Sequence, residues 1–514
     1  MAPQLEQRSR RETEAAGDTG SLGLNLIADR WVAGDGPRTR TLRNPADTGE
    51  VVAEVREASA GQVEAACAAA AQAFPAWQVT PPPERARFLF RYRELLEEHF
   101  DVLAELIVRE NGKLLAEARG SLRRGIDMVE FACGIPSLLM GRTLPDVSAN
   151  VDSYVLLEPV GVVVGIPPFN FPAMIPLWMM PLAVACGNTF ILKPAEKAPL
   201  TATRLVELFR ESGLPAGVVN VVQGGQEVSE RLIAHPQVRA ISFVGSSAVA
   251  EAVYRAAASH GKRVQALGGA KNHLLVLPDA DLPRSLPALV GACFGCAGQR
   301  CLAGSVLVAV GDRRQQDAVV EAFAGAARSL RLGDSLDPST GMGPVVNEEQ
   351  RRRILDAIDR GVREGAKLVL DGRSAVVADR PRGCFVGPTV FDEVTPEMFI
   401  GREEVFGPVV GVMRAKDLDE ALTLTNRSRY GNSASLFTQS GAAAREFRAR
   451  AQAGMLGVNL GVPAPMAFFS FGGWKQSFFG DLHAHGPDAV AFYTRKKVVT
   501  ERWFGAEAPK EGWV

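Results

Sequence analysis

The chain has 514 residues, of which 46% are apolar and 22% charged, the proportions of a soluble globular protein with roughly two to four domains. This composition excludes a disordered chain, a collagen-like repeat and a small disulfide scaffold. The 57 basic and 58 acidic residues give a net charge of -1, so no global field favours a polyanion, and we expect neither nucleic-acid nor membrane partners.

The first residues and the cysteines indicate where the protein works. Residues 1–20 are polar and mix acidic side chains with arginines, so they lack the features of a signal or transit peptide. We interpret them as a disordered, solvated tail. The seven cysteines are too few and too odd in number for a disulfide framework, which favours a reducing compartment. We therefore expect a cytoplasmic protein.

Helical and strand periods alternate along most of the chain, which predicts an α/β fold with a parallel sheet covered by helices. Residues 85–109 are predicted to form one amphipathic helix. Residues 155–166 are predicted to form one strand, followed by a proline-rich loop, an apolar helix to about residue 186 and a short strand over 189–192. Strand, helix and strand together predict a βαβ unit.

Residues 160–192 contain no charged side chain, a run longer than the roughly 20 residues that cross a bilayer. Prolines interrupt the run at positions 167, 168, 172, 176 and 181. A lipid-facing helix with these prolines would leave backbone groups unpaired. We therefore interpret the run as the buried centre of an α/β domain.

The alternation continues with helices over 201–212 and 227–234 and strands over 218–222 and 240–244. Gly245 and Ser246 follow the last of these strands, where a helix is expected to begin. A helix N-terminus favours an anion, so this pair is a candidate phosphate site, although glycines after strands often only form turns. A second βα series is expected over residues 274–412.

Cys293 and Cys296 have the spacing of a zinc or redox motif. A zinc site needs two further ligands, and the remaining candidates are scattered through the sequence. We therefore expect no metal, and interpret both cysteines as small buried residues on an apolar helix face. His483 and His485 are assigned to the surface or to an interface.

Cys301 follows Arg300 at the end of the same apolar segment. A turn there would expose the thiol beside a fixed positive charge, which favours the nucleophilic thiolate. A lone cysteine is nonetheless more often structural than catalytic, so the local pattern leaves both interpretations open.

Six motifs follow one another along the chain: Pro168-Phe169-Asn170-Phe171-Pro172, Lys193-Pro194-Ala195-Glu196, Phe243-Val244-Gly245-Ser246, Leu267-Gly268-Gly269, Gly298-Gln299-Arg300-Cys301 and Glu404-Val405-Phe406-Gly407-Pro408. In these motifs and their order the chain resembles the aldehyde dehydrogenase superfamily, from about residue 27 to 503. A narrower match lies in residues 264–273, in the arginine before the cysteine, in residues 470–475 and in residues 492–495. In these residues the chain is most similar to the CoA-acylating methylmalonate-semialdehyde dehydrogenases.

The resemblance implies a Rossmann-type cofactor domain, an α/β catalytic domain and a small β oligomerisation segment. We assign the NAD-binding domain to residues 21–147 and 168–273, and the catalytic domain to residues 274–477. Residues 148–167 and 478–505 are assigned to the bridging segments. A homo-oligomer, dimer or tetramer, follows by analogy only.

The resemblance also implies the chemistry. Cys301 would attack the aldehyde carbon, the side chain of Asn170 and the backbone N–H of Cys301 would hold the oxyanion, and hydride would leave to NAD. By residue type alone, the favoured interpretation of Asn170 is a loop asparagine that holds a turn among prolines. Hydrolytic relatives usually carry a glutamate where Ala266 stands, and alanine cannot activate water. The resemblance therefore favours coenzyme A as acyl acceptor.

Substrate recognition is assigned by the resemblance to Arg124 and Arg300, whose guanidinium groups would face a carboxylate of the substrate. Malonate or methylmalonate semialdehyde would then give acetyl-CoA or propionyl-CoA with loss of CO2. Arg124 could instead form an ion pair on a helix face. Phe468 and Phe469 replace polar rings of the group, which predicts a more apolar wall at Phe469 and a larger or less polar semialdehyde.

For the cofactor, the resemblance places Lys193 and Glu196 at the adenosine ribose, and a carboxylate there favours NAD over NADP. Ser246 would touch the pyrophosphate, and Glu404 would hold the nicotinamide-side ribose. Pro167 retains the carbonyl that the family uses. The other residues expected at the cofactor are Phe169, Lys197, Gly245, Leu267, Gly268 and Phe406.

Two alternatives stay open. The first is a hydrolytic aldehyde dehydrogenase of an acid-bearing aldehyde, which Ala266 disfavours. The second is a binding protein derived from a dehydrogenase that has no turnover, which the presence of Cys301, Asn170, Lys193 and Glu404 disfavours.

Overall fold

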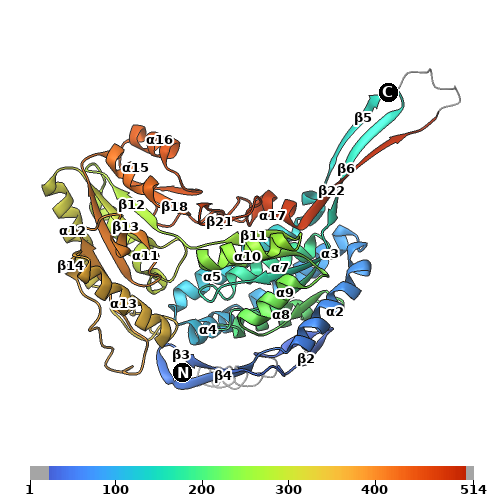
Figure 1. Ribbon diagram of the computed structural model, residues 1–514, viewed down its shortest axis with the longest axis horizontal. Helices are drawn as coiled ribbons and strands as arrows, with labels where there is room; N and C mark the ends of the chain where they lie inside the picture. The colour runs from blue at the N-terminus through green and yellow to red at the C-terminus, as the bar shows by residue number, and fades with distance from the viewer. Residues whose placement is uncertain (1–21, 505–514) are drawn as a thin grey trace, which may run out of the picture.

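The computed structural model describes residues 22–504, so the tail expected at residues 1–20 lies outside the described residues. Figure 1 shows two lobes, each built on a sheet covered by helices, and an arm of long strands that projects from one lobe. The α/β architecture predicted from the sequence is confirmed. No described helix is long and apolar enough to cross a membrane.

The first lobe holds an eight-stranded sheet with the strand order β2-β1-β9-β8-β7-β10-β11-β21. Its central strands are apolar and buried along their whole length, as expected of parallel strands covered on both faces. The strands of the sheet are β1 (Asn25–Ile27), β2 (Arg30–Val32), β7 (Val162–Ile166), β8 (Thr189–Leu192), β9 (Val219–Val221), β10 (Val238–Val244), β11 (Arg263–Leu267) and β21 (Phe478–Phe479). A separate hairpin pairs β3 (Thr39–Asn44) with β4 (Asp47–Arg56).

Helices cover both faces of this sheet and bury two apolar clusters against it. The entirely buried α7 (Met174–Ala185) confirms the predicted apolar helix and, with β7 and β8, the βαβ unit. The other helices are α2 (Ala60–Gln78), α3 (Pro82–Glu98), α4 (Phe100–Asn111), α5 (Leu115–Cys133), α6 (Ile135–Leu138), α8 (Leu200–Glu211), α9 (Gln226–Ala234), α10 (Ser247–Ser259) and α17 (Gly486–Tyr493).

The second lobe has a seven-stranded sheet and its own apolar core, which confirms the second βα series. The strand order is β14-β15-β16-β13-β12-β18-β19. Its strands are β12 (Asn272–Val276), β13 (Gly304–Val310), β14 (Lys367–Leu370), β15 (Thr389–Asp392), β16 (Val409–Ala415), β18 (Ser433–Phe437) and β19 (Met455–Val458). A short pair joins β17 (Tyr430–Gly431) to β20 (Trp474–Lys475). The helices are α11 (Leu282–Phe294), the 3-10 turn η1 (Gly295–Gly298), α12 (Arg313–Arg328), α13 (Glu348–Arg363), α14 (Phe399–Arg402), α15 (Leu418–Arg427) and α16 (Gly441–Arg450).

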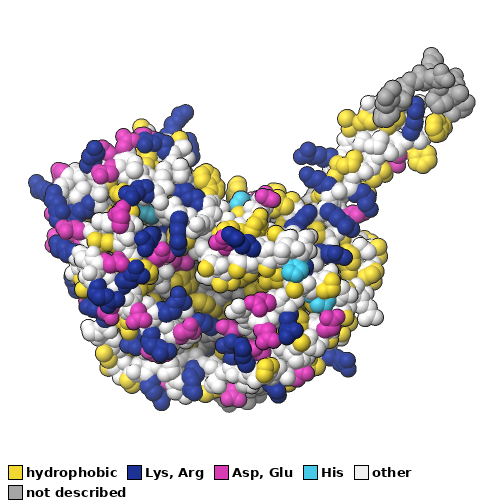
Figure 2. Space-filling view, viewed as in Figure 1, with side chains coloured by type: hydrophobic (Ala, Val, Ile, Leu, Met, Phe, Trp, Pro, Cys, Tyr) yellow, Lys and Arg dark blue, Asp and Glu magenta, His cyan; other side chains and the backbone are white. Residues whose placement is uncertain are grey.

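The arm is a three-stranded antiparallel sheet of β5 (Arg142–Ser148), β6 (Val151–Pro159) and β22 (Thr494–Arg502). Figure 2 shows hydrophobic side chains along it, and Leu144, Leu156 and Val498 are among the exposed ones. Large exposed apolar groups on a protruding sheet are typical of a surface that meets another protein.

Two sequence predictions were wrong in detail. The helix predicted over 85–109 is two helices, α3 and α4, which meet at His99, and both pack against α5. The strand predicted over 155–166 is also divided, because Gly161 has a φ of 130° and turns the chain from the arm strand β6 into the sheet strand β7. Residues after Gly161 therefore belong to the first sheet rather than to the bridging segment.

Candidate active site

Three neighbouring parallel strands direct motif residues to one edge of the first sheet. The strand β7 lies beside β10, and β10 lies beside β11. The carboxyl ends of parallel strands meet at the same edge, where α/β proteins bind their ligands. Pro167 and Asn170 follow β7, Gly245 and Ser246 follow β10, and Gly268 follows β11. The sequence-predicted residues of this lobe are thus brought together.

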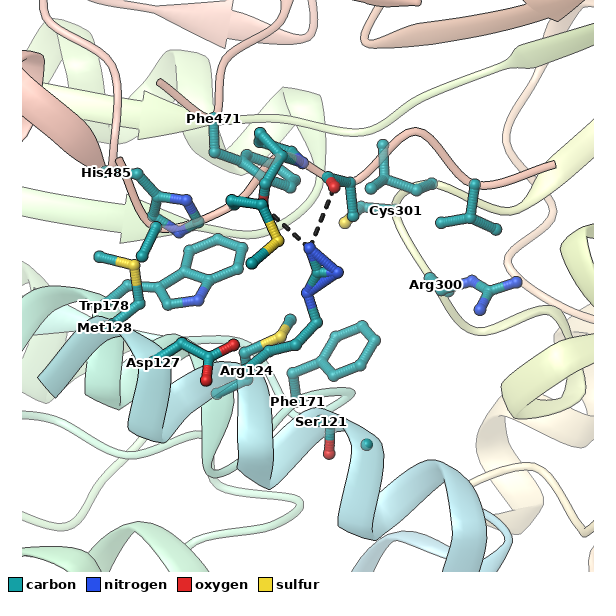
Figure 3. Close-up of a pocket in the computed structure, with 18 of the residues that line it drawn as sticks. Ser121, Arg124, Asp127, Met128, Phe171, Trp178, Arg300, Cys301, Phe471 and His485 are labelled. Carbon is teal, nitrogen blue, oxygen red and sulfur yellow. Dashed lines mark hydrogen bonds between the residues drawn. The ribbon is translucent and has the colours of Figure 1, made fainter. Parts of the chain in front are cut away.

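Cys301 comes from the second lobe, in a turn between η1 and β13. It lines a cavity of about 330 Å³ that is shared with α5, α7 and the loop before β20 (Figure 3). The carbonyl of Cys301 accepts hydrogen bonds from the side-chain amides of Asn272 (2.8 Å) and Asn432 (2.9 Å). These two amides fix the peptide that carries the thiol, and the sequence analysis did not identify either of them.

Asn170 is buried and held next to this turn. Its side-chain Nδ2 donates to the backbone carbonyl of Gln299 at 3.0 Å. The backbone carbonyl of Asn170 accepts a hydrogen bond from the Nζ of Lys113 at 2.7 Å. Lys113 in turn lies 3.9 Å from the ring centroid of Phe171. An amide nitrogen carries two hydrogens, so one N–H of Asn170 remains for a ligand beside Cys301.

The expected stabilisation of a Cys301 thiolate was wrong. Desolvation raises the pKa of this thiol to about 12, and the carboxylate of Glu404 acts in the same direction. Arg300 and the backbone N–H groups of Cys301 and Leu302 lower the pKa, but by less. The thiol is therefore protonated at neutral pH and has to lose its proton when it reacts.

The two arginines expected to converge on a carboxylate point in different directions in Figure 3. The Nη2 of Arg124 donates to the carbonyls of Ala464 and Pro465, at 3.0 Å each, and its guanidinium lies in the cavity. Arg300 also lines the cavity, but its Nη2 donates to the carbonyls of Gly291 (2.7 Å) and Ala292 (3.0 Å) in the last turn of α11. The Nη2 of Arg300 is thus held at a helix C-terminus, where a cation is favoured, while its buried Nε has no hydrogen-bond partner among the described residues.

Other parts of the cavity wall also differ from the expectation. Phe469 is 65% exposed, packs edge-on against Phe468 at 6.1 Å, and is not among the cavity-lining residues. Cys293 is buried in α11 as expected, but Cys296 is only half-buried, has a φ of 54° and lines the cavity. The aromatic wall consists of Phe171, Trp178 and Phe471.

His485 was assigned to the surface, and this was wrong: only 4% of the residue is exposed, and its ring lines the cavity. His483, by contrast, is half-buried and is not among the residues that line the cavity. Its Nδ1 lies 3.2 Å from a carboxylate oxygen of Asp488. The pattern of the sequence does not distinguish the two histidines, because packing against distant residues decides which one is buried.

Residues expected at the adenosine end of a dinucleotide lie in and beside a second cleft. Lys193 is buried and donates from Nζ to the carbonyl of Gly224 at 2.8 Å, and desolvation lowers its pKa to about 8. Glu196 and Lys197 line the cleft. An oxygen of Glu196 lies 2.6 Å from Nη2 of Arg40, although the angle is not that of a hydrogen bond. The short distance makes this an ion pair.

The phosphate site predicted after β10 has the geometry of a helix N-terminus. Ser246 is the N-cap of the 13-residue helix α10, and its exposed hydroxyl makes no capping hydrogen bond. A Cβ at Gly245 would lie 2.4 Å from the Phe243 ring, and one at Gly268 would lie 2.8 Å from the carbonyl of Gln476. Both positions therefore require glycine, which leaves their backbone open to a ligand. Leu267, at the end of β11, is buried.

Glu404 is not among the residues that line the second cleft and lies beside Gly269 and Ala270. Its Oε1 accepts from the backbone N–H of Ala270 at 3.0 Å, and a Cβ at Gly269 would lie 2.3 Å from its Oε2. Desolvation raises the pKa of Glu404 to about 7. Phe169 and Phe406 pack edge to face with centroids 5.8 Å apart. The Nζ of Lys197 lies 5.8 Å from the Phe169 ring centroid, and Pro167 is buried at the end of β7.

Metal ligands are not gathered at these sites. Within residues 22–504 no group of three or more histidine, cysteine, aspartate or glutamate side chains could hold a metal ion. The cavity instead combines a thiol and a guanidinium, and the Asn170 amide is bound to the turn that carries the thiol, which suits a nucleophilic attack on a carbonyl compound that carries an anionic group.

Known proteins match the chain along nearly its whole length. Malonate-semialdehyde dehydrogenase 2 of Geobacillus kaustophilus is 52% identical over 480 residues, which are 93% of this chain and 98% of the relative. The solved structure of methylmalonate-semialdehyde dehydrogenase of Oceanimonas doudoroffii is 47% identical, with a TM-score of 0.92 over 95% of this chain and 99% of that one. A Sinorhizobium meliloti protein solved with NAD is 44% identical, with the same TM-score and the same coverage. The model of the aldehyde dehydrogenase family matches residues 31–499, and the chain belongs to this family.

Proposed function

We propose that the protein oxidises malonate semialdehyde, or its methyl-substituted form, with NAD and transfers the acyl group to coenzyme A with loss of CO2. One observation carries the proposal: Cys301 lines a cavity that also contains Arg124, and the amide of Asn170 is hydrogen-bonded to the turn that carries Cys301. Ala266 stands where hydrolytic relatives usually carry a glutamate. The names of the relatives above support the same substrate class.

Three groups of the chain suit NAD. Glu196, in the second cleft, offers a carboxylate to ribose hydroxyls. Ser246 offers a hydroxyl and a helix N-terminus to a pyrophosphate, and Glu404 offers a carboxylate whose charge acts on Cys301. NAD held by these residues would supply the acceptor for hydride. The chain itself provides the nucleophile, the oxyanion donors and the substrate cavity.

The first step is attack by the Cys301 sulfur on the aldehyde carbon, which forms the C–S bond and moves the carbonyl electron pair to oxygen. The free N–H of Asn170 and the backbone N–H of Cys301 stabilise that oxyanion. The thiol proton needs an acceptor. Glu404 is the carboxylate whose charge acts on the sulfur, and its pKa of about 7 suits proton transfer at neutral pH.

Release of the Cys301 thioester then depends on the acceptor. Ala266 is fully buried in β11 beside Phe243, and Glu403 is held by Arg402 and Arg429. Water therefore lacks a carboxylate base on β11 itself, at the position where hydrolytic relatives usually have a glutamate, whereas a thiol with a pKa near 8.5 supplies its own anion. When the C–C bond to the carboxylate breaks, CO2 leaves. The electron pair of that bond stays on the α-carbon as an enolate, which the thioester carbonyl stabilises until the α-carbon takes up a proton.

We also infer that the arm joins copies of the chain into a dimer or tetramer, and that the enzyme works in the cytoplasm. The exposed apolar side chains of the arm support the first inference. The seven cysteines support the second, because all of them are free thiols, as expected in a reducing compartment.

The test is NADH formation from malonate semialdehyde with and without coenzyme A, together with mass spectrometry of the products. The proposal predicts sustained NADH formation and an acyl-CoA product only when coenzyme A is present. An equal rate without coenzyme A, with release of a free acid, would favour the hydrolytic alternative. Absence of NADH under both conditions would favour a protein without turnover.

A further inference from the structure

His485 occupies the cavity opposite Cys301 in Figure 3. It immediately precedes α17, and its backbone φ is 69°, a value that residues other than glycine rarely adopt. The ring packs edge-on against Trp178, with centroids 4.2 Å apart at 89°, and lies 5.5 Å from the ring of Phe471. The imidazole is therefore held in one orientation by neighbours from α7 and from the C-terminal loop.

Both ring nitrogens of His485 are buried and have no hydrogen-bond partner among the described residues. Buried polar atoms are normally hydrogen-bonded, because leaving one unpaired costs free energy. A histidine kept in place by aromatic packing, with both nitrogens unpaired and its ring in a cavity wall, indicates that the missing partner is a ligand.

The charges around the ring determine what that ligand can be. Desolvation, together with the smaller effect of the positive charge of Arg124, lowers the pKa of His485 to about 3. The neutral ring has one N–H donor and one acceptor nitrogen. Arg124 shares the cavity, and among the described residues no carboxylate lies within ion-pair distance of it, although its charge acts on Asp127. The carboxyl of Asp127 also lines the cavity and would repel an anion. An anionic group is therefore best held between His485 and Arg124, away from Asp127.

We propose that His485 is a specificity-determining residue that donates a hydrogen bond to one oxygen of the substrate carboxylate, while Arg124 holds the other oxygen. This rests on the proposed oxidation of an acid-bearing semialdehyde. The second ring nitrogen remains for a water molecule. The proposed role assigns recognition of the carboxylate to Arg124 on α5 and to His485 before α17. The sequence predicts Arg124 and Arg300 for this task.

The test compares malonate semialdehyde with propanal, which has the same carbon chain and no carboxylate. In His485→Phe the aromatic packing is retained and the N–H is lost. We expect kcat/KM to fall about ten- to a hundredfold for malonate semialdehyde and to change less than about threefold for propanal. His485→Asn should recover part of the loss, because asparagine has a donor and tolerates a positive φ. The matched control is His483→Phe, which should leave both substrates unaffected.

A direct binding measurement separates this proposal from the proposed function. Malonate, which cannot react, is titrated calorimetrically into the wild-type protein and into His485→Phe, and melting temperatures verify that the variants fold. About tenfold weaker binding by the variant would support the role of His485 even if neither aldehyde gives NADH. Unchanged malonate binding, an equal loss on both aldehydes or no loss on either would overturn the proposal.

Discussion

Arg124 lies within α5 and Arg300 lies in the turn before β13, and their substitution should have different consequences. Replacing Arg124 with methionine keeps a long apolar stem and removes the guanidinium from the cavity. A guanidinium has five N–H groups; two at Nη2 donate to the carbonyls of Ala464 and Pro465, which leaves three for a substrate. Three donors are enough for a two-point contact with a carboxylate.

The magnitude follows from that contact. Hydrogen bonds to a charged group contribute about 1.5–3 kcal/mol, so Arg124→Met should lower kcat/KM for malonate semialdehyde roughly ten- to 150-fold. The two carbonyls that lose their donor are only half-buried, and water can replace part of the contact. We therefore expect the free energy of unfolding to fall by less than about 2 kcal/mol.

Arg300→Met should behave differently, because Arg300 donates to the carbonyls of Gly291 and Ala292 at the end of α11. Loss of these bonds should destabilise the protein by about 1–2 kcal/mol and loosen the turn that carries Cys301. Activity toward malonate semialdehyde and toward propanal should then fall by similar factors.

The assay measures kcat/KM of the wild type and both variants with the two aldehydes, with urea unfolding as the control for stability. The ratio of the two kcat/KM values should change strongly in Arg124→Met and little in Arg300→Met. If Arg300→Met shows the same selective loss on the acid-bearing aldehyde, or if Arg124→Met shows none, the separation of the two arginines argued from the structure is refuted.

Three further predictions concern the oxyanion donor Asn170, the carboxyl group of Glu404 and the selectivity for the cofactor. Asn170→Ala should lower kcat roughly 100- to 1,000-fold while the rate of Cys301 alkylation by iodoacetamide stays within about threefold; a matching loss of alkylation would contradict the oxyanion role. Glu404, with a pKa raised from 4.5 to about 7, contributes stability that is present below about pH 4.5 and lost as the pH rises through 7. Glu404→Gln should therefore flatten the decline of the urea midpoint between about pH 5 and pH 8, and an unchanged decline would contradict this. Glu196→Ala should raise the use of NADP relative to NAD, because Arg40 then faces the ribose site without its carboxylate partner; unchanged cofactor selectivity in NADH and NADPH assays would argue against that site.

The elements that could be predicted from the sequence are those with a strong local signal. The run over 160–192 is apolar on all sides and contains prolines, and it forms the buried β7, α7 and β8 as expected. The order of the motifs also brought Asn170 and Cys301 to one place from two different lobes. Such features depend on short-range composition or on spacing within the chain.

The remaining features depend on partners that are distant in sequence. Arg300 is directed by the carbonyls of Gly291 and Ala292 at the end of α11, which compete with any substrate for its Nη2. His485 is buried because Trp178 and Phe471 surround its ring, although its surroundings in the sequence are those of a surface loop. The pKa of Cys301 depends on desolvation, which outweighs the neighbouring positive charge that the sequence makes visible.

The central claim is that Cys301 carries an acyl thioester that coenzyme A, and not water, discharges. The most direct measurement mixes the enzyme rapidly with NAD and malonate semialdehyde without coenzyme A and follows NADH while intact-protein mass spectrometry detects the adduct. We predict a burst of NADH equal to the concentration of sites, an acetyl or malonyl group on Cys301, and its removal when coenzyme A is added. Continuous NADH formation without coenzyme A and without a lasting adduct on Cys301 would contradict the account.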